Sequence, residues 1–253
     1  MRKIMFLLFG LFISTANAES INIDWIVDNE TYTTTTCNIG DDLILPTAPT
    51  KYGYTFQGWL AYTPIEYLES TGTQYIDTGI SQHIALSSIT QYIGIGFSDF
   101  YNARQLSGFN GAKDNYFGIT PINNGFVFDI QPSPKGTHII IKNIKYDLRL
   151  EQLSNKTTLI VKLDDTIVDS LVATSYAGFN SSKLYIYRTS GNYTPLYYAR
   201  IYYYKVLLDN ILVRDFIPVL DPADVPCMYD RVTNTYFYNS GTGNFIAGSV
   251  IGE

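Results

Sequence analysis

The feature that most limits the fold is a succession of short segments in which apolar and polar residues alternate, with turn signals roughly every ten residues. Two of them, "TTLIVKL" and "ARIYYYKVLL", run directly into the pairs Asp164-Asp165 and Asp209-Asn210, which are typical of tight turns. Helical periodicity is nearly absent: in the most helix-like stretch, "YDLRLEQLS", the leucines alternate as in a strand. The pattern predicts an all-β protein, either a sandwich or a jelly roll.

Composition agrees with this fold class and limits the partners. Aromatic residues make up 15% of the chain, 22 residues are tyrosines, and only 16% are charged, which favours strands over helices. The net charge is −6 and there is no basic cluster. Because phosphate contacts depend on Lys and Arg, nucleic acid is excluded as an expected partner.

The first eighteen residues have the order of a cleaved secretory signal. Arg2 and Lys3 precede the apolar run 4–13, and Ala16-Asn17-Ala18 suits signal peptidase. We expect cleavage after Ala18 and export to the periplasm, the cell surface or the medium; a buried N-terminal helix is the alternative. Removing 18 of 253 residues leaves 235, and the loss of two positive charges changes the net charge from −6 to −8. No later stretch approaches the roughly twenty apolar residues of a membrane helix, so no membrane span is expected after cleavage.

A small module is predicted over residues 21–60. It contains Gly40-Asp41, then Pro46 and Pro49, and ends on "GYTFQGW" at 53–59. These motifs resemble the internalin-type B repeat, also called the Listeria–Bacteroides repeat. The resemblance implies a small β-grasp-like unit that acts as a spacer or weak interaction module and has no catalytic residues. One departure is "DNE" at 28–30, where the family usually has a Gly-Gly turn.

A larger module is predicted over residues 65–250. It opens on "IEYLESTGTQYIDTGI", continues through the hairpin "LIVKLDDTIVDSL", and closes on "MYDRVTNTYFYNSGTGNFIAG". This order of strands resembles the concanavalin A-like lectin/glucanase superfamily in its laminin G-like form. The resemblance implies a jelly-roll β-sandwich of a bacterial surface or secreted protein. Asp165 replaces the glycine usual in the hairpin turn.

No pattern for catalysis stands out. The glycosidase signature Glu-x-Asp-x-x-Glu is absent, and Glu66 and Glu69 point to opposite faces of an extended segment. His83 and His138 are the only histidines, and neither has a nucleophile signature beside it; His138 is expected to begin a strand. We therefore predict that the protein is not an enzyme.

No metal or other cofactor is predicted. No Cys/His spacing suggests zinc. Some laminin G-like domains bind calcium, and Asp99, Asp114 and Asp129 are candidate donors, but no local pattern marks a site.

Cys37 and Cys227 are the only cysteines and lie in different predicted modules. Export would allow a disulfide that fixes one module against the other. The alternative is two separate thiols, because a sequence cannot show that the two meet.

The stretch "LYYARIYYYK" at 196–205 holds five tyrosines. Strict alternation in a strand puts one set in the core and the other toward water. The core set is Tyr197, Ala199, Ile201 and Tyr203; the outer set is Tyr198, Arg200, Tyr202 and Tyr204.

The segment "KLYIYR" divides in the same way, with Leu184 and Ile186 inward and Tyr185 and Tyr187 outward. If the two strands pair, one face carries several tyrosines beside a guanidinium, which suits stacking on a sugar. The candidate ligand-binding residues are Tyr185, Tyr187, Tyr198, Arg200, Tyr202 and Tyr204. A cross-strand ladder that only stabilises the sheet, and a face covered by the first module, are the alternatives.

The function predicted from these observations is a non-catalytic binding or adhesion protein that recognises carbohydrate or a surface partner. One alternative is a structural module of an envelope or extracellular assembly. A second is a glycoside hydrolase with an atypical site. The sequence does not indicate the oligomeric state.

Overall fold

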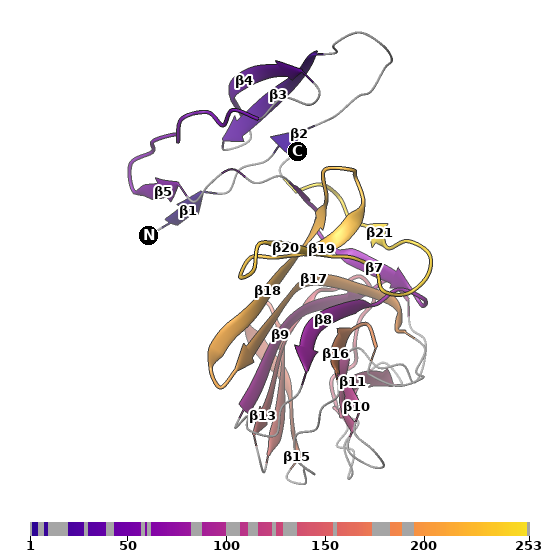
Figure 1. Ribbon diagram of the computed structural model, residues 1–253. Helices are drawn as coiled ribbons and strands as arrows, with labels where there is room; N and C mark the ends of the chain where they lie inside the picture. Colours follow the sequence, from indigo (N-terminus) through magenta and orange to yellow (C-terminus); the bar gives the residue numbers. More distant parts are fainter. Residues whose placement is uncertain are drawn as a thin grey trace.

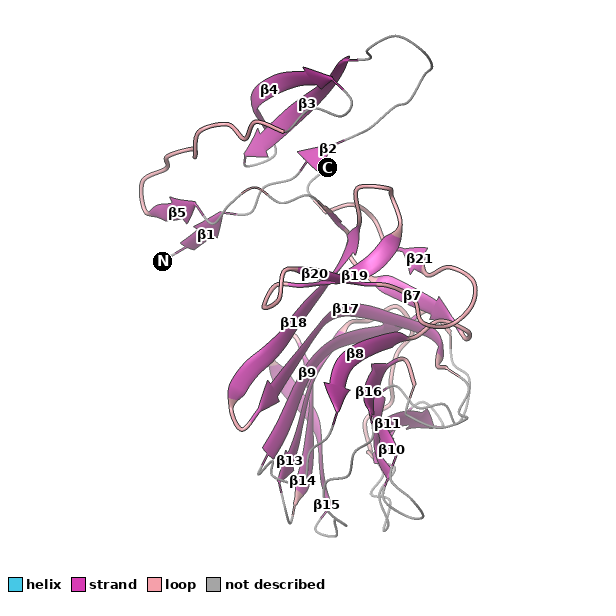
Figure 2. Ribbon diagram, viewed as in Figure 1, coloured by secondary structure: helices cyan, strands magenta, loops and turns pink. Residues whose placement is uncertain are grey.

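The computed structural model describes residues 2–4, 8–9, 20–27, 30–38, 43–56, 59, 62–81, 88–99, 107–110, 116–122, 125–128, 136–153, 156–173, 183–188 and 195–251. This part of the chain consists of strands, turns and irregular segments and contains no helix (Figure 2). The predicted all-β class is therefore confirmed. None of the described residues forms a helix with the length and apolarity needed to cross a bilayer.

The strands before residue 57 form two small sheets of their own. β2 (Leu8–Phe9), β3 (Ser20–Val27) and β4 (Glu30–Asn38) make one sheet, and β1 (Arg2–Ile4) pairs in parallel with β5 (Tyr54–Phe56). Trp25 on β3 is buried and packs edge-on against Trp59, with ring centroids 4.8 Å apart. β1 and β2 lie within the predicted signal, so the expected cleavage would remove both from the mature chain.

All later strands belong to two larger sheets. The large sheet has the order β15-β14-β13-β9-β17-β18-β19-β20; off this path, β6 pairs with β18, β7 pairs with β17, and β21 pairs with β7. Its strands are β6 (Thr63–Pro64), β7 (Leu68–Thr71), β9 (Ser88–Phe97), β13 (Tyr146–Leu153), β14 (Thr157–Leu163), β15 (Thr166–Ala173), β17 (Tyr197–Leu208), β18 (Ile211–Leu220), β19 (Pro226–Asp230), β20 (Thr235–Phe237) and β21 (Ile246–Ala247). The small sheet has the order β12-β11-β10-β16-β8, with β8 (Ile76–Ser81), β10 (Ser107–Asn110), β11 (Tyr116–Ile122), β12 (Gly125–Phe128) and β16 (Lys183–Ile186).

The small sheet covers one face of the large sheet (Figure 1), and the core fills the space between them. Ile76 and Leu184 from the small sheet join Ile93, Leu148 and Leu159 from the large one, and all five are at most 2% exposed. Since the inward residues alternate along each strand, the residues between them lie on the outer faces.

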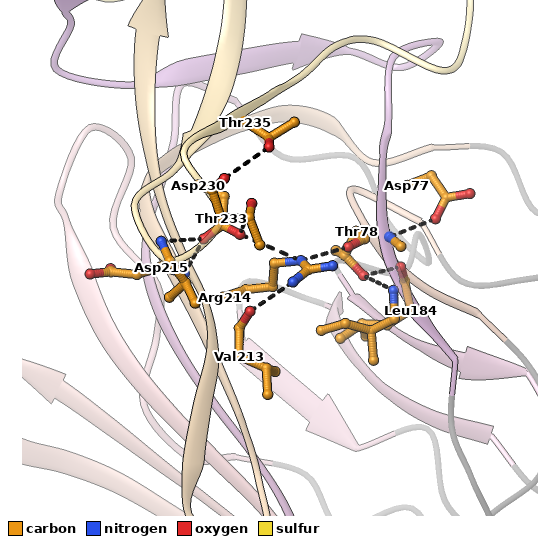
Figure 3. A network of polar contacts seen from close by, with 12 residues as sticks. Asp77, Thr78, Leu184, Val213, Arg214, Asp215, Asp230, Thr233 and Thr235 are labelled. Carbon is orange, nitrogen blue, oxygen red and sulfur yellow. Dashed lines mark hydrogen bonds and ion pairs between the residues drawn. The ribbon is translucent and has the colours of Figure 1, made fainter. Parts of the chain in front are cut away.

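A buried polar network also links the two sheets (Figure 3). Arg214 on β18 donates from Nε to the backbone oxygen of Thr78 on β8, at 2.9 Å. Its Nε also lies 3.7 Å from Oδ2 of Asp230, a residue that is completely buried. The Asp230 carboxylate accepts further hydrogen bonds from Asp215 N, Val232 N and Thr233 Oγ1.

Both predicted two-residue turns are present. Asp164 and Asp165 have φ of 47° and 63°, and Asp209 and Asn210 have φ of 48° and 66°. Two successive positive φ values match the right-handed twist of a hairpin. His138, in contrast, does not begin a strand: it lies in the irregular segment before β13, with Nε2 at 3.3 Å from the hydroxyl of Tyr146.

Candidate functional site

An irregularity in β17 decides which tyrosines reach the outer face of the large sheet. Ile201 pairs with Ile95 on β9, but the next pair is Tyr203 with Gly94, so Tyr202 is an extra residue. Such a bulge puts two successive side chains on the same side. Tyr202 and Tyr203 therefore both lie on the outer face, and Tyr204 enters the core, where it is 0% exposed.

Glycines on β9 make room for the two outer rings. A Cβ atom at Gly94 would lie 2.6 Å from the Tyr203 ring, and one at Gly96 would lie 3.3 Å from the Tyr202 ring. The rings of β17 thus lie across the glycine backbone of the neighbouring strand. The two rings therefore lie against the sheet and form a shallow aromatic surface, instead of projecting away from the sheet.

Polar neighbours hold these rings in place. The Tyr203 hydroxyl donates to Oδ1 of Asp147 at 2.8 Å, and Lys145 Nζ lies 5.3 Å from the Tyr203 centroid and 5.6 Å from that of Tyr202. Burial, followed by the hydrogen bond to Asp147, raises the pKa of Tyr203 well above its usual value. Tyr203 is therefore a neutral hydroxyl on a fixed ring at neutral pH.

Two adjoining pockets open over this surface. One, of about 450 Å³, is lined by Tyr92, Tyr203, Lys205 and Arg231. The other, of about 350 Å³, is lined by Tyr92, Asp147, Leu148, Arg149, Ile160, Lys162, Asp165 and Tyr203. Because Tyr92 and Tyr203 line both, the two pockets form one groove that crosses the strands, which we call the tyrosine groove.

The predicted ligand-binding residues do not come together. β16 lies between β8 and β10 in the small sheet, whereas β17 lies in the large sheet, so the two strands do not pair. Tyr187 has a φ of 71° and points into the core, where it is 0% exposed and its hydroxyl donates to Leu68 O at 2.5 Å. The outward placement of Tyr187 and Tyr204, and the inward placement of Tyr203, are thus wrong.

The remaining predicted residues lie on outer surfaces. Tyr198 is 39% exposed, with a φ of 59°. Arg200 donates to Glu69 at 2.7 Å and lies 4.7 Å from the centroid of the Tyr67 ring. Tyr202 lies next to Tyr203 in β17, with Lys145 Nζ 5.6 Å from its ring centroid.

Tyr185 lies on the opposite outer face of the sandwich. Its ring is 5.5 Å from that of Tyr75, and Arg188 lies over both rings. The inward placement of Leu184 and Ile186 on the same strand is confirmed.

Sequence reasoning missed most of the tyrosine groove, including Tyr92, Asp147, Tyr203, Lys205 and Arg231. One local signal was present, because "YIGIGF" places two glycines in alternation on one face of a strand. That signal points to a close neighbour but does not identify which strand supplies it.

The candidate disulfide does not form in the structure, where Cys37 and Cys227 are both free thiols. Cys37 is on β4, and Cys227 on β19 is completely buried in a small cluster with Tyr62 and Val219. Burial raises the pKa of Cys227 to about 12. Cys227 is thus enclosed by apolar and aromatic side chains such as Tyr62, Val219 and Tyr229.

Of the candidate calcium donors, Asp99 forms an ion pair with Lys142. Asp114, Asp129 and also His83 lie outside the described residues. Within the described ranges, no group of three or more His, Cys, Asp or Glu side chains could hold a metal ion.

The fold and the groove define the class of molecule: a β-sandwich with an aromatic, charge-lined groove across its large sheet. No family model matches the chain, and no curated protein matches it. One solved structure similar to it is a candidate carbohydrate binding protein from Bacteroides ovatus, with 13% identity, a TM-score of 0.48, and coverage of 94% of this chain and 71% of that chain. A likeness this distant carries no argument about function, so the groove is interpreted from its own chemistry.

Proposed function

We propose that the chain is an exported, non-catalytic carbohydrate-binding protein of the bacterial surface and that the tyrosine groove is its binding site. The observation that carries the proposal is the Tyr203 ring, which lies over Gly94 and is held by Asp147 in the wall shared by both pockets. A fixed aromatic ring with polar groups around it suits a sugar, which has apolar C–H faces and a rim of hydroxyl groups.

The charged groups around the ring suit the rim of a sugar. Asp147 and Asp165 can accept hydrogen bonds from sugar hydroxyls, and Arg149, Lys162 and Lys205 can donate them. Glu69, one of the two glutamates considered for catalysis, is 6% exposed and is engaged by Arg200 and Ser98. Because these contacts occupy the Glu69 carboxylate, they favour a binding role over hydrolysis.

The proposed export depends on the signal at 1–18, and the two resemblances support a surface role through a B-repeat-like spacer followed by a laminin G-like domain. N-terminal sequencing of the protein recovered from the medium or envelope tests export. A first residue of Glu19 is the expected result. Recovery of the uncleaved chain from the cytoplasm would contradict it.

A glycan array with the mature chain tests the binding function. The alanine variants Tyr92→Ala and Tyr203→Ala should each weaken binding of any glycan found by about tenfold or more, equivalent to at least roughly 1.4 kcal/mol. Tyr198→Ala is the matched control, because Tyr198 is exposed but lines neither pocket. A silent array would favour the structural-module alternative, and reducing-sugar release from polysaccharides would favour the hydrolase.

A further inference from the structure

We propose that the tyrosine groove selects acidic glycans and that Lys205 and Arg231 bind a sugar carboxylate at one end of it. This inference rests on the proposed carbohydrate binding and specifies the class of sugar. It follows from the order of charges across the sheet.

The residues of the groove form a row perpendicular to the strands. Lys205 on β17 is paired on one side with Asp215 on β18 and on the other with Tyr92 on β9. Tyr92 is in turn paired with Arg149 on β13. At the far end, Arg231 N donates to Asp215 O at 3.0 Å, so Arg231 continues the row. Cations therefore stand on both sides of the aromatic centre.

At the Arg231 end of the groove, the carboxylate of Asp215 pairs with both Arg231 and Lys205. Arg231 Nη2 lies 2.7 Å from Oδ2 of Asp215, and Lys205 Nζ lies 3.5 Å from Oδ1. The Asp215 side chain is only 13% exposed, whereas those of Lys205 and Arg231 are 37% and 42% exposed. Two positive groups thus face the groove above one buried negative group, which leaves one positive charge uncompensated there.

The Lys205 ammonium also has hydrogen-bonding capacity left. Oδ1 of Asp215 is buried and takes no hydrogen bond from the described residues, so Lys205 contacts it only as an ion pair. An ammonium has three donors, and a carboxylate entering from the groove can accept from them and from Arg231.

The other end of the groove is closer to neutral. The Asp147 carboxylate accepts from Tyr203 and lies 3.7 Å from Lys145, and Arg149 pairs with Glu151 at 3.1 Å. The whole chain has a net charge of −6. An uncompensated positive site attracts an anionic ligand and gives no electrostatic advantage to a neutral one. We therefore place the sugar carboxylate between Lys205 and Arg231 and a sugar ring against Tyr203.

The experiment compares oligosaccharides of galacturonic, glucuronic and mannuronic acid with their carboxyl-reduced, neutral counterparts. At least one acidic oligosaccharide should bind the mature chain about tenfold or more tightly than its reduced form, with an affinity that falls as salt is added. Lys205→Gln and Arg231→Gln should each lower this preference, measured as the ratio of the two affinities, severalfold. Lys183→Gln is the control, because Lys183 lies on the small sheet and pairs with Asp77.

The possible failures are distinguishable. Equal affinity for acidic and reduced forms, or an acidic preference that survives Lys205→Gln, overturns the inference and leaves carbohydrate binding intact. Binding of only neutral glycans on the array would also overturn the inference and leave carbohydrate binding intact. Absence of binding to every glycan overturns both proposals. Lys205→Gln keeps the test valid if Arg231→Gln fails to fold, because Lys205 makes only the longer contact to Asp215.

Discussion

Asp230 shows how a single side chain can hold several elements together. Its carboxylate is 0% exposed, accepts three hydrogen bonds from β18 and the β19–β20 turn, and faces Arg214, which reaches across to β8 (Figure 3). A buried carboxylate costs free energy unless it is paired in this way. Removing it leaves the Arg214 charge without its counter-ion and the amides of Asp215 and Val232 without their acceptor.

We expect Asp230→Ala to lower the free energy of unfolding by roughly 3–5 kcal/mol, the usual cost of breaking a buried ion pair from one side. Urea denaturation of the mature chain provides the measurement. Asp99→Ala is the matched control: Asp99 pairs with Lys142 in the open, with side chains about half exposed, so its loss should cost about 0–1 kcal/mol. Equal losses in the two variants would show that the network is not a stabilising feature.

At the scale of elements, the β17–β18 hairpin depends on its turn. Asn210 has a φ of 66°, a conformation that Asn and Gly tolerate and β-branched residues do not. Asn210→Val should therefore lower the free energy of unfolding by roughly 1–2 kcal/mol, and Asn210→Gly should leave it nearly unchanged. The comparison can be made by thermal unfolding; a Val variant as stable as the Gly variant would mean that the turn adjusts without strain.

Glycan binding should depend on the contact between β9 and β17. A methyl group at Gly94 would lie 2.6 Å from the Tyr203 ring, so Gly94→Ala should displace the ring and weaken glycan binding by about tenfold. In a Tyr203→Ala background the same substitution should have no further effect on affinity, because the two changes act on one contact. Additive losses in that double-mutant cycle would contradict this explanation.

At the scale of the whole molecule, burial in the folded chain determines how readily each of the two thiols reacts. Cys37 is half-buried on β4, whereas burial raises the pKa of Cys227 from 9.0 to about 12. An alkylating reagent at pH 8 should therefore modify Cys37 and spare Cys227 until the protein is unfolded, since the thiolate is the reactive form. Mass spectrometry of the digested protein distinguishes the two sites. Labelling of both thiols at equal rates in the folded protein would contradict the burial of Cys227.

The same shift has a consequence for alkaline stability. A thiol whose pKa is raised on folding contributes stability that is present below pH 9 and is lost as the pH rises toward 12. Tyr236, beside the same cluster, also has its pKa raised to about 12, by burial first and by Cys227 second. Ionisation of Cys227 and of Tyr236 therefore favours unfolding as the pH rises toward 12.

The sequence by itself determined the fold class and the local turns. Alternation of apolar and polar residues favours strands at any position in a sheet, and Asp209-Asn210 can take positive φ without help from distant residues. The inward positions of Ala199, Ile201, Leu184 and Ile186 were likewise predicted correctly, because alternation holds from Ala199 to Ile201 and from Leu184 to Ile186.

The tertiary structure alone decided which strands meet and therefore where the tyrosine groove lies. A single extra residue at Tyr202 reverses the faces of all later residues in β17, and no local pattern marks such a bulge. The placement of β16 in the opposite sheet likewise depends on packing between segments far apart in the chain. Alternation assigns residues to two faces, but only the register between distant strands decides which tyrosines share an outer face with Lys205 and Arg231.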